Sequence, residues 1–275
     1  MPMIQANGVR LYQEVRGSGP PVLLIMGATG DAGLFTKVAD LLSDEFTVIT
    51  YDRRGTGRSP RPPNWTATSP EEQADDAAAL LRALGVDGAA VFGSSSGGVF
   101  ALCMLVRHPR LVRGCVLHEP TLARLYDDPD TLRRVAAMAE QARAEGGAAL
   151  AVERFWRLVA GDAAWNELEP ALRDRMMATG DTLLDVEFGN FEHYLPSEAE
   201  FAQITVPLQL IVSENGRPGQ HQAAGRLAER FGLPVHRVPG THASYWDHPA
   251  ELCASLRPFL HQLTPTSPSS PHPPS

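Results

Sequence analysis

The chain has 275 residues, of which 43% are hydrophobic and 20% charged, and a formal net charge of −8 at pH 7. This composition is that of an ordinary globular protein and excludes a wholly disordered or fibrous chain. The acidic balance argues against a nucleic-acid partner, because phosphate binding needs clustered cations.

The N-terminal sequence MPMIQANGVRLYQEV has neither the basic start nor the apolar run of a signal peptide. No later stretch is apolar for long enough to cross a bilayer, so we expect a cytoplasmic protein without a membrane partner. The three cysteines, Cys103, Cys115 and Cys253, lack the spacing of a metal site or of a disulfide framework. The length fits one large domain and leaves a homodimer possible.

Short apolar runs alternate with longer helical segments along the chain. This is the pattern of an α/β protein, in which helices cover both faces of a mostly parallel sheet. The runs GPPVLLIMG and GAAVFG are continuously apolar, as strands buried on both faces should be. Ser69 and Pro70, followed by two glutamates, predict a helix that runs to about Leu84. The predicted strands are residues 10–15, 21–26, 46–51, 88–92, 113–118, 206–212 and 235–238.

The strand pattern stops between residues 121 and 200, where sequences such as TLRRVAAMAEQARAEGG predict amphipathic helices. A helical block between two strands of one sheet is an insertion, and we call residues 121–200 the lid. We expect residues 1–120 and 201–263 to form the core, and the Pro- and Ser-rich residues 264–275 to be a disordered tail. The lid holds five candidate substrate-contacting residues, whose aromatic members have the alternative role of filling the lid's own core: Trp156, Phe188, Phe191, His193 and Tyr194.

The segment VFGSSSGGVF, residues 91–100, has the spacing Gly-x-Ser-x-Gly between an apolar strand and an apolar helix. This spacing singles out Ser95 as a nucleophile, at the centre of a turn too tight for side chains at the flanking glycines. Such a turn strains the backbone and places the serine hydroxyl above the sheet. The Ser96 amide, at the start of the helix, points to the same place and favours negative charge there. A plain Gly-Ser connection is the alternative interpretation.

A serine hydroxyl needs a base to remove its proton, and a third group to orient that base. His242 follows the last predicted strand, so its loop can return over the carboxyl edge of the sheet. The acidic residue that would orient His242 is harder to identify, because Gly216 occupies the position at which this order of elements leads us to expect an aspartate. Glu119, at the end of the strand after the nucleophile's helix, is the predicted acid, and Glu214 is its main rival. A buried carboxylate at position 119 needs a partner, which is either the imidazole or, alternatively, an arginine.

A second group of backbone amides follows the strand at residues 21–26. The sequence LLIMGATGDAG forms a glycine-rich loop where a second oxyanion donor is expected. We therefore expect the amides of Ala28 and Ser96 to share the oxyanion of an acyl-transfer reaction.

These motifs together resemble the α/β-hydrolase superfamily over roughly residues 8–262. The sequence YDRRGTGRS is similar to the family's D-x-R-G-x-G-x-S turn, whereas MGATG departs from the usual H-G start by having Met26. More narrowly, GSSSG, CVLHEP and VPGTH resemble zearalenone lactone hydrolases and related bacterial serine hydrolases. Their triad is serine, glutamate and histidine, with the glutamate after the strand that follows the elbow helix. Matched residue by residue, this resemblance again implies Ser95, Glu119 and His242.

The motifs and the resemblance predict a serine hydrolase. We expect it to cleave an ester or lactone of a medium-sized hydrophobic molecule through an acyl-enzyme on Ser95, with no metal or organic cofactor. Thioesterase, carbon–carbon bond hydrolase and hydroxynitrile-lyase chemistry are alternatives on the same triad. A ligand receptor on a hydrolase scaffold is an alternative from another class.

Overall fold

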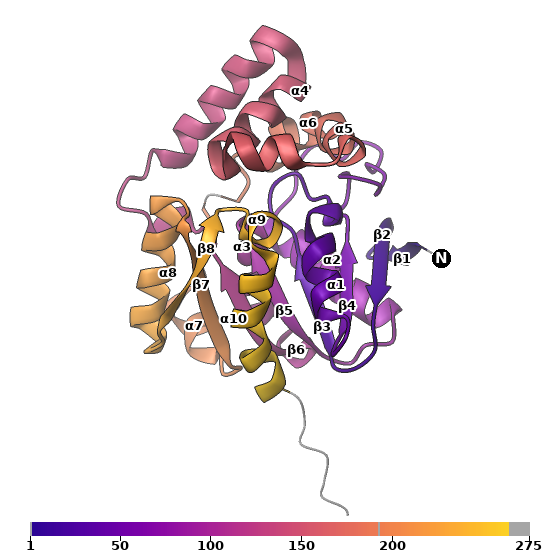
Figure 1. The fold of residues 1–275 in the computed structure, drawn as a ribbon, viewed down its shortest axis with the longest axis vertical. Coiled ribbons are helices and arrows are strands. Elements are labelled where there is room, and N and C mark those ends of the chain that lie inside the picture. Colours follow the sequence, from indigo (N-terminus) through magenta and orange to yellow (C-terminus); the bar gives the residue numbers. More distant parts are fainter. Residues whose placement is uncertain (1, 192, 264–275) are drawn as a thin grey trace, which may run out of the picture.

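The computed structural model describes residues 2–191 and 193–263, so the predicted disordered tail lies outside the described residues. Eight strands form one sheet in the order β1-β2-β4-β3-β5-β6-β7-β8 (Figure 1). The pairs β1–β2 and β2–β4 are antiparallel, and every pair from β4 to β8 is parallel. The strands are β1 Met3–Ala6, β2 Val9–Arg16, β3 Pro21–Ile25, β4 Thr47–Tyr51, β5 Ala89–Ser94, β6 Val112–His118, β7 Leu208–Asn215 and β8 Val235–Thr241.

The seven predicted strands are confirmed, with boundaries that differ by a few residues. The strand β1 was not predicted. It has only four residues, is mostly not buried, and pairs only with β2 at the edge of the sheet. A short edge strand of this kind has neither the continuous apolar run nor the strict alternation on which the prediction depends.

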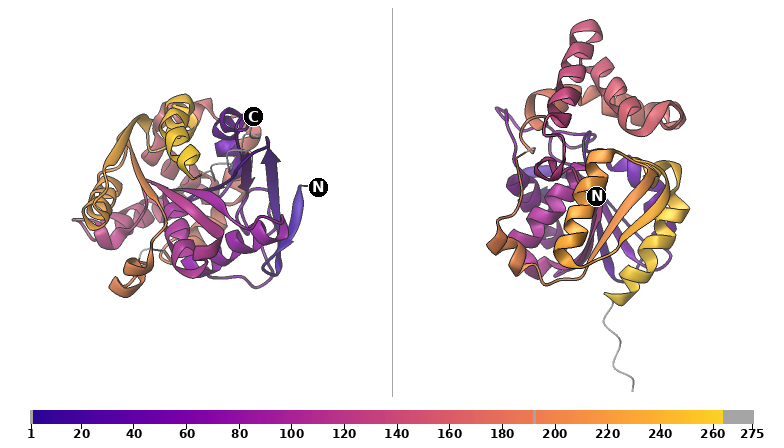
Figure 2. Two further views of the ribbon diagram at one scale, coloured as in Figure 1. Left: turned by 90° about the horizontal axis from the view of Figure 1, so that it is seen from below. Right: turned by 90° about the vertical axis from the view of Figure 1, so that its left-hand side faces the viewer.

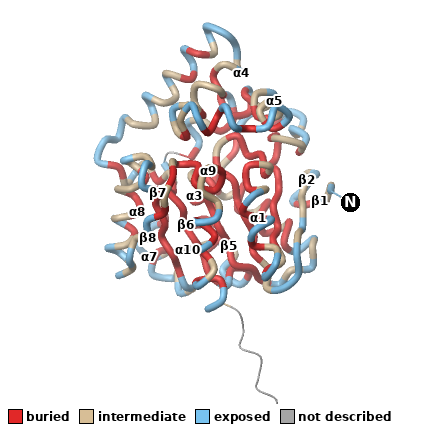
Figure 3. The backbone as a smooth tube through the Cα atoms, in the orientation of Figure 1, coloured by how far each residue is buried: buried red, intermediate tan, exposed pale blue. Residues whose placement is uncertain are grey.

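Helices cover both faces of the sheet, because successive residues of a strand point to opposite faces (Figure 2). In β3, Val22 and Leu24 pack into one hydrophobic core and Leu23 and Ile25 into the other. The central strands are accordingly the most continuously buried part of the chain (Figure 3). On the Val22 face lie α1 Thr36–Leu42 and α10 Pro249–Gln262, and on the opposite face lie α2 Pro70–Ala83, α3 Ser96–Arg107 and α8 Pro218–Phe231.

The helix predicted from Ser69 to Leu84 is confirmed as α2. The Ser69 side chain accepts a hydrogen bond from the Glu72 amide at 3.2 Å, and Pro70 occupies the first turn. This is the cap that the sequence pattern predicts, because the first amides of a helix have no intrahelical partner.

Helices of the lid lie above the carboxyl edge of the parallel strands (Figure 1). The longest, α4, is interrupted where Gly147 and Gly161 have positive φ values of 83° and 86°. Residues 193–203 run down the side of the core, where Phe201 packs into the hydrophobic core that also contains residues of α2 and α3. The elements between β6 and β7 are η3 Ala123–Leu125, α4 Thr131–Glu167, α5 Pro170–Ala178, α6 Gly180–Thr182, the π-helical turn η4 Leu183–Glu187 and α7 Glu198–Gln203.

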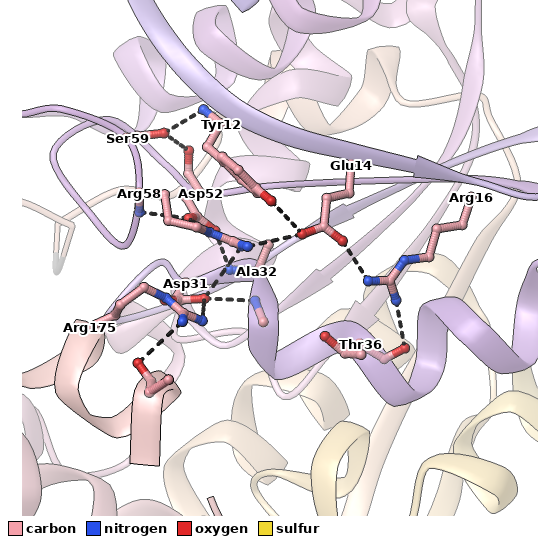
Figure 4. A network of polar contacts seen from close by, with 12 residues as sticks. Tyr12, Glu14, Arg16, Asp31, Ala32, Thr36, Asp52, Arg58, Ser59 and Arg175 are labelled. Atoms are coloured by element: carbon pink, nitrogen blue, oxygen red, sulfur yellow. Dashed lines mark hydrogen bonds and ion pairs between the residues drawn. The ribbon is translucent and has the colours of Figure 1, made fainter. Parts of the chain in front are cut away.

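Several polar contacts join the lid to loops at the edge of the sheet, among them those of Arg175 and Thr182. Arg175 of α5 donates from Nε to the buried Asp31 carboxylate at 2.7 Å (Figure 4). Thr182 donates from Oγ1 to the carbonyl of Gly55 at 2.9 Å. The lid is therefore fixed to the loops that follow β3 and β4. Within residues 2–191 and 193–263, no helix has the length and apolar character needed to cross a membrane.

Candidate active site

Ser95 lies in the turn between β5 and α3 with φ of 58° and ψ of −126°. A positive φ is strained for a residue with a side chain and is typical of functional turns. The flanking glycines make the turn possible. A Cβ on Gly93 would lie 2.3 Å from the Gly97 carbonyl oxygen, and one on Gly97 would lie 2.1 Å from the Ile25 carbonyl oxygen. No side chain fits at either position.

The serines of this turn have different surroundings. Ser94 is fully buried, and its hydroxyl contacts His118 Nδ1 at 2.8 Å beneath the turn. Ser95 lines the large cavity above the sheet, and its hydroxyl contacts the Thr121 hydroxyl at 3.1 Å. Ser96 also lines this cavity and begins α3. Of the two serines with a described side-chain hydrogen bond, only Ser95 presents its hydroxyl at the cavity.

Glu119 directly follows β6 and is fully buried. Its Oε2 accepts a short hydrogen bond from Nδ1 of His242, which itself lines the cavity with Ser95. Its Oε1 accepts hydrogen bonds from the Ser213 amide at 2.8 Å and from His221 Nε2 at 3.2 Å. The carboxylate thus joins two histidines and a backbone amide.

The hydrogen bonds of Glu119 decide its ionisation. Burial alone raises the pKa of a carboxyl group, but the hydrogen bonds from His221 and His242, together with the charge of His242, outweigh burial and hold the pKa of Glu119 well below its usual range. The ionised carboxylate accepts only, so Nδ1 of His242 carries the proton. The other ring nitrogen, Nε2, is then left to act as a base.

The position of Gly216 explains why the expected aspartate is missing there. A Cβ on Gly216 would lie 1.7 Å from Oε1 of Glu119 and 2.7 Å from Nε2 of His221. The rival acid, Glu214, is exposed at the end of β7. The structure therefore brings Glu119, and not Glu214, to His242.

The glycine-rich loop after β3 approaches the nucleophile closely. A Cβ on Gly27 would lie 2.8 Å from the Cβ of Ser95. The amide of Gly30 donates to the carbonyl of Gly27 at 3.0 Å, which closes a turn with Ala28 at its second position. Ala28 and Ser96 both line the cavity beside Ser95.

A buried arginine holds this loop in place. Arg53 has no exposed surface, and it donates from Nε to the Met26 carbonyl at 3.0 Å and from Nη2 to the Gly27 carbonyl at 2.8 Å. Its Nη1 lies 2.6 Å from the carboxylate of Glu187, the last residue of η4. Arg53 therefore links the loop that carries Ala28 to the lid.

A second buried carboxylate fixes the far end of the loop. Asp52 accepts hydrogen bonds from the Ala32 amide at 2.8 Å and from Arg58 Nε at 2.6 Å (Figure 4). Burial raises the pKa of Asp52, and the hydrogen bond and charge of Arg58 oppose that effect. The glycine-rich loop is thus attached at both ends to the segment after β4.

The cavity above Ser95 encloses about 750 Å³, counted to its open mouth. Its walls are mostly apolar and come largely from the lid, as in many small-molecule sites. Apolar wall residues include Leu132, Val135, Phe155, Val159, Phe188 and Phe191, and polar residues include Thr121, Glu187, Arg217, Gln220 and His242.

A model of the alpha/beta hydrolase fold family matches residues 20–249. The chain belongs to this family. The uncharacterized hydrolase YraK of Bacillus subtilis (strain 168) is 30% identical over 94% of this α/β hydrolase and 94% of its own length. A zearalenone hydrolase of Cladophialophora bantiana is 27% identical over 90% of this chain and 91% of its own.

A thermophilic esterase from Thermogutta terrifontis has the same fold as this family member. The two structures superpose with a TM-score of 0.75 at 20% identity, over 95% of this chain and 98% of the esterase. This likeness supports the fold, in agreement with the sheet order and with the resemblance seen in the motifs.

The candidate substrate-contacting residues of this α/β hydrolase divide into two groups. Phe188 and Phe191 line the cavity. Trp156 is 2% exposed and packs against Trp165, with 6.4 Å between ring centroids. His193 is exposed, and Tyr194 packs against the hydrophobic core on the α2 and α3 face of the sheet. None of Trp156, His193 and Tyr194 lines the cavity.

Sequence reasoning did not single out Thr121, Glu187 or Arg217, all of which line the cavity. Thr121 lies two residues after Glu119, so its place beside the site follows once Glu119 is placed. Glu187 and Arg217 belong to no motif with a fixed spacing. In the described part of the chain, no group of three or more His, Cys, Asp or Glu residues is arranged to hold a metal ion.

Proposed function

We propose that this protein is a serine hydrolase that cleaves esters or lactones of medium-sized hydrophobic molecules through an acyl-enzyme on Ser95. One observation carries the proposal: the buried Glu119–His242 pair and the strained Ser95 meet at the same cavity. A carboxylate that orients an imidazole beside a serine hydroxyl is the arrangement that activates serine for acyl transfer.

In the proposed reaction, the Ser95 hydroxyl turns from Thr121 to Nε2 of His242, which takes its proton as Oγ attacks the carbonyl carbon. Catalytic hydrogen bonds often form only when substrate is bound, so the Thr121 contact is compatible with this step. The carbonyl oxygen becomes an oxyanion that the amides of Ala28 and Ser96 stabilise. Glu119 keeps the imidazole in the required tautomer and stabilises the imidazolium.

The acyl-enzyme forms when the carbon–oxygen bond of the ester breaks and His242 returns the proton to the leaving alcohol. Water then attacks the acyl carbon while His242 takes one of its protons, and the acid is released as Ser95 regains its hydrogen. In a lactone, the acid and the alcohol remain in one molecule. Every proton in this scheme passes through one imidazole, so no metal or organic cofactor is required.

The apolar cavity walls support a hydrophobic substrate, with Phe188 and Phe191 as the wall residues of the proposed binding site. The similarity to a protein named zearalenone hydrolase supports lactones as one substrate class to test. The acidic net charge supports a protein that acts without a nucleic-acid partner. A cytoplasmic location and a homodimer remain predictions from the sequence.

A fluorophosphonate probe tests the proposal directly, because it labels only an activated serine. We expect rapid labelling of the wild-type protein, none of Ser95→Ala, and loss of at least 1,000-fold in ester turnover by Ser95→Ala. Thioesters, carbon–carbon bond substrates and macrocyclic lactones, assayed beside aryl esters, distinguish the reactions that this triad supports. A wild-type protein that is neither labelled nor active on any of them would be a ligand receptor.

A further inference from the structure

Glu187 is a buried carboxylate in an otherwise apolar wall of the cavity. It is 2% exposed, ends the π-helical turn η4 of the lid, and lines the cavity with Ser95 and His242. Its carboxylate forms an ion pair with Arg53 Nη1 at 2.6 Å. Neither of its carboxylate oxygens accepts a hydrogen bond from any described residue.

This arrangement leaves acceptor capacity unused on a buried side chain that lines the cavity. An ionised carboxylate can accept about four hydrogen bonds, and a buried one without partners is costly. The other charged residue of the cavity wall with a long side chain, Arg217, differs because its guanidinium donates to the carbonyl of Leu158 at 3.1 Å. Glu187 is therefore the acidic residue of the wall whose carboxylate lacks a hydrogen-bonding partner and that a ligand could satisfy.

The neighbours of Glu187 define which ligand group fits. Arg53 already balances the negative charge, so a neutral donor suits the carboxylate better than a second cation. Hydrogen bonds to an ionised acceptor are stronger than those between neutral groups, which favours a hydroxyl. Arg53 also donates a hydrogen bond to the Gly27 carbonyl. A single guanidinium group therefore connects the Glu187 carboxylate to the loop that carries Ala28. The donor therefore belongs on a part of the substrate only a few bonds from the carbonyl carbon.

We propose that Glu187 is a specificity-determining residue whose carboxylate accepts a hydrogen bond from an alcohol or phenol hydroxyl of a hydrophobic ester or lactone. This inference rests on the proposed function, because it assumes that the substrate carbonyl lies at Ser95. The Glu187 carboxylate is held by its ion pair with Arg53, and five residues before it Thr182 donates a hydrogen bond to the Gly55 carbonyl of the core.

Matched esters test the inference. The probes are 4-nitrophenyl 3-phenylpropanoates with a hydroxyl at the ortho, meta or para position, each compared with its methyl ether and with the unsubstituted ester. We expect the wild type to prefer at least one hydroxyl isomer by about tenfold or more in kcat/KM. In Glu187→Leu this ratio should fall to about one, whatever the absolute rate of the variant on the unsubstituted ester. The inference is overturned if no isomer is preferred, or if Glu187→Leu keeps the preference.

Two further variants keep the test decisive. Leu183→Val changes an apolar wall residue of the same turn and should change all esters alike, with the hydroxyl preference unchanged. Because Glu187→Leu leaves Arg53 buried without its carboxylate, the double variant Arg53→Met/Glu187→Leu provides a second protein that lacks both charges. Its absolute rates need not match wild type, because the ratio between hydroxyl and unsubstituted esters is the measurement.

Binding to Ser95→Ala separates failure of this inference from failure of the proposed function. We expect calorimetry to show about tenfold tighter binding of the preferred hydroxyl ester than of its methyl ether, and loss of the difference in Ser95→Ala/Glu187→Leu. If wild type hydrolyses nothing but this binding difference is present, the proposed function fails and the recognition by Glu187 stands. If wild type hydrolyses esters without any hydroxyl preference in rate or binding, the inference fails and the proposed function stands.

Discussion

The Glu119 carboxylate fills the space in which a side chain at Gly216 would stand. A Cβ on Gly216 would lie 1.7 Å from Oε1 of Glu119, far inside any contact distance. The acid that orients His242 can therefore come from the end of β6 or from the loop after β7, but both positions cannot carry it at once. A glycine at 216 is the consequence of a glutamate at 119.

Replacing this glycine should displace the acid. We expect Gly216→Ala to lower ester kcat/KM by at least tenfold and to destabilise the fold by about 1–3 kcal/mol, because the methyl group overlaps a buried carboxylate. Gly225→Ala is the matched control, since a Cβ at that position in α8 meets nothing within 4 Å. It should leave turnover unchanged and stabilise the helix by about 0.5–1 kcal/mol. Steady-state kinetics and urea unfolding of both variants measure these effects. Similar losses of kcat/KM in Gly216→Ala and Gly225→Ala would contradict the prediction.

The space shared by the two positions predicts that the acid can be moved. Glu119→Gly should lose most ester turnover, because His242 loses the acceptor for Nδ1. Adding Gly216→Asp to that variant places a carboxylate in the vacated space and should recover at least tenfold in kcat. The Glu119→Gly substitution should not strain the backbone, because φ at position 119 is 44°, a value that glycine adopts readily. A double variant no more active than Glu119→Gly would show that the loop cannot aim a carboxylate at the imidazole.

The two candidate acids should respond very differently to loss of charge. Glu119→Gln removes a buried carboxylate that bonds His242 and should lower kcat by about 1,000-fold or more. Glu214→Gln alters an exposed side chain and should stay within about twofold of wild type. Steady-state kinetics of both variants on one aryl ester give the two kcat values. A large decrease of kcat in Glu214→Gln alone would assign the acid to Glu214 instead of Glu119.

The features that the sequence predicted share a local cause. The strained turn at Ser95 requires glycine two residues before and two residues after the serine. Five consecutive residues of the sequence therefore suffice to identify it. Short, continuously apolar runs between helical segments likewise marked the buried strands. Glu119 needed one further step, the recognition that a glycine stood where an acid was expected.

The features that the sequence did not predict arise from contacts between distant segments. The Arg53–Glu187 pair joins a loop of the core to the lid, and no spacing rule relates the two residues. Aromatic composition alone also cannot separate Phe188, which lines the cavity, from Trp156, which packs against Trp165. Only the folded arrangement of the lid makes that distinction, because Trp156 lies inside α4 whereas Phe188 directly follows η4 and faces the cavity.

The ion pair between the lid and the loop after β3 should influence substrate binding. Arg175→Met removes the contact with the buried Asp31 carboxylate, so the lid side of the cavity loses a fixed attachment. We expect kcat/KM for hydrophobic esters to fall by about three- to tenfold, mainly through KM. Arg143→Met is the control, because Arg143 is similarly exposed but pairs with Asp181 and Asp185 inside the lid. An equal effect of both variants would show that the attachment to the core is unimportant.

A buried histidine beneath the site should make folding stability depend on pH. His118 is fully buried, with hydroxyl groups of Ser94, Ser213 and Ser244 around its ring. Burial is the main cause that lowers the pKa of His118 from 6.5 to about 4, and the nearby Glu119 carboxylate opposes it. Between these values the unfolded chain binds a proton that the folded protein does not. Stability from this residue is therefore complete above pH 6.5 and falls by about 3 kcal/mol as the pH drops to 4.

His118→Gln should remove this pH dependence, because glutamine keeps polar contacts with the hydroxyl groups but does not titrate. Urea unfolding at pH 7.5, 6.5, 5.5 and 4.5 measures it as a flatter slope than in wild type. The lowered pKa of Glu119 acts in the same sense but in a lower pH range, since its stabilisation is lost only as the pH falls below its unfolded value near 4.5. The exposed His236 serves as the control, and His236→Gln should keep the wild-type slope. Parallel slopes for wild type and His118→Gln would mean that folding does not lower the pKa of His118.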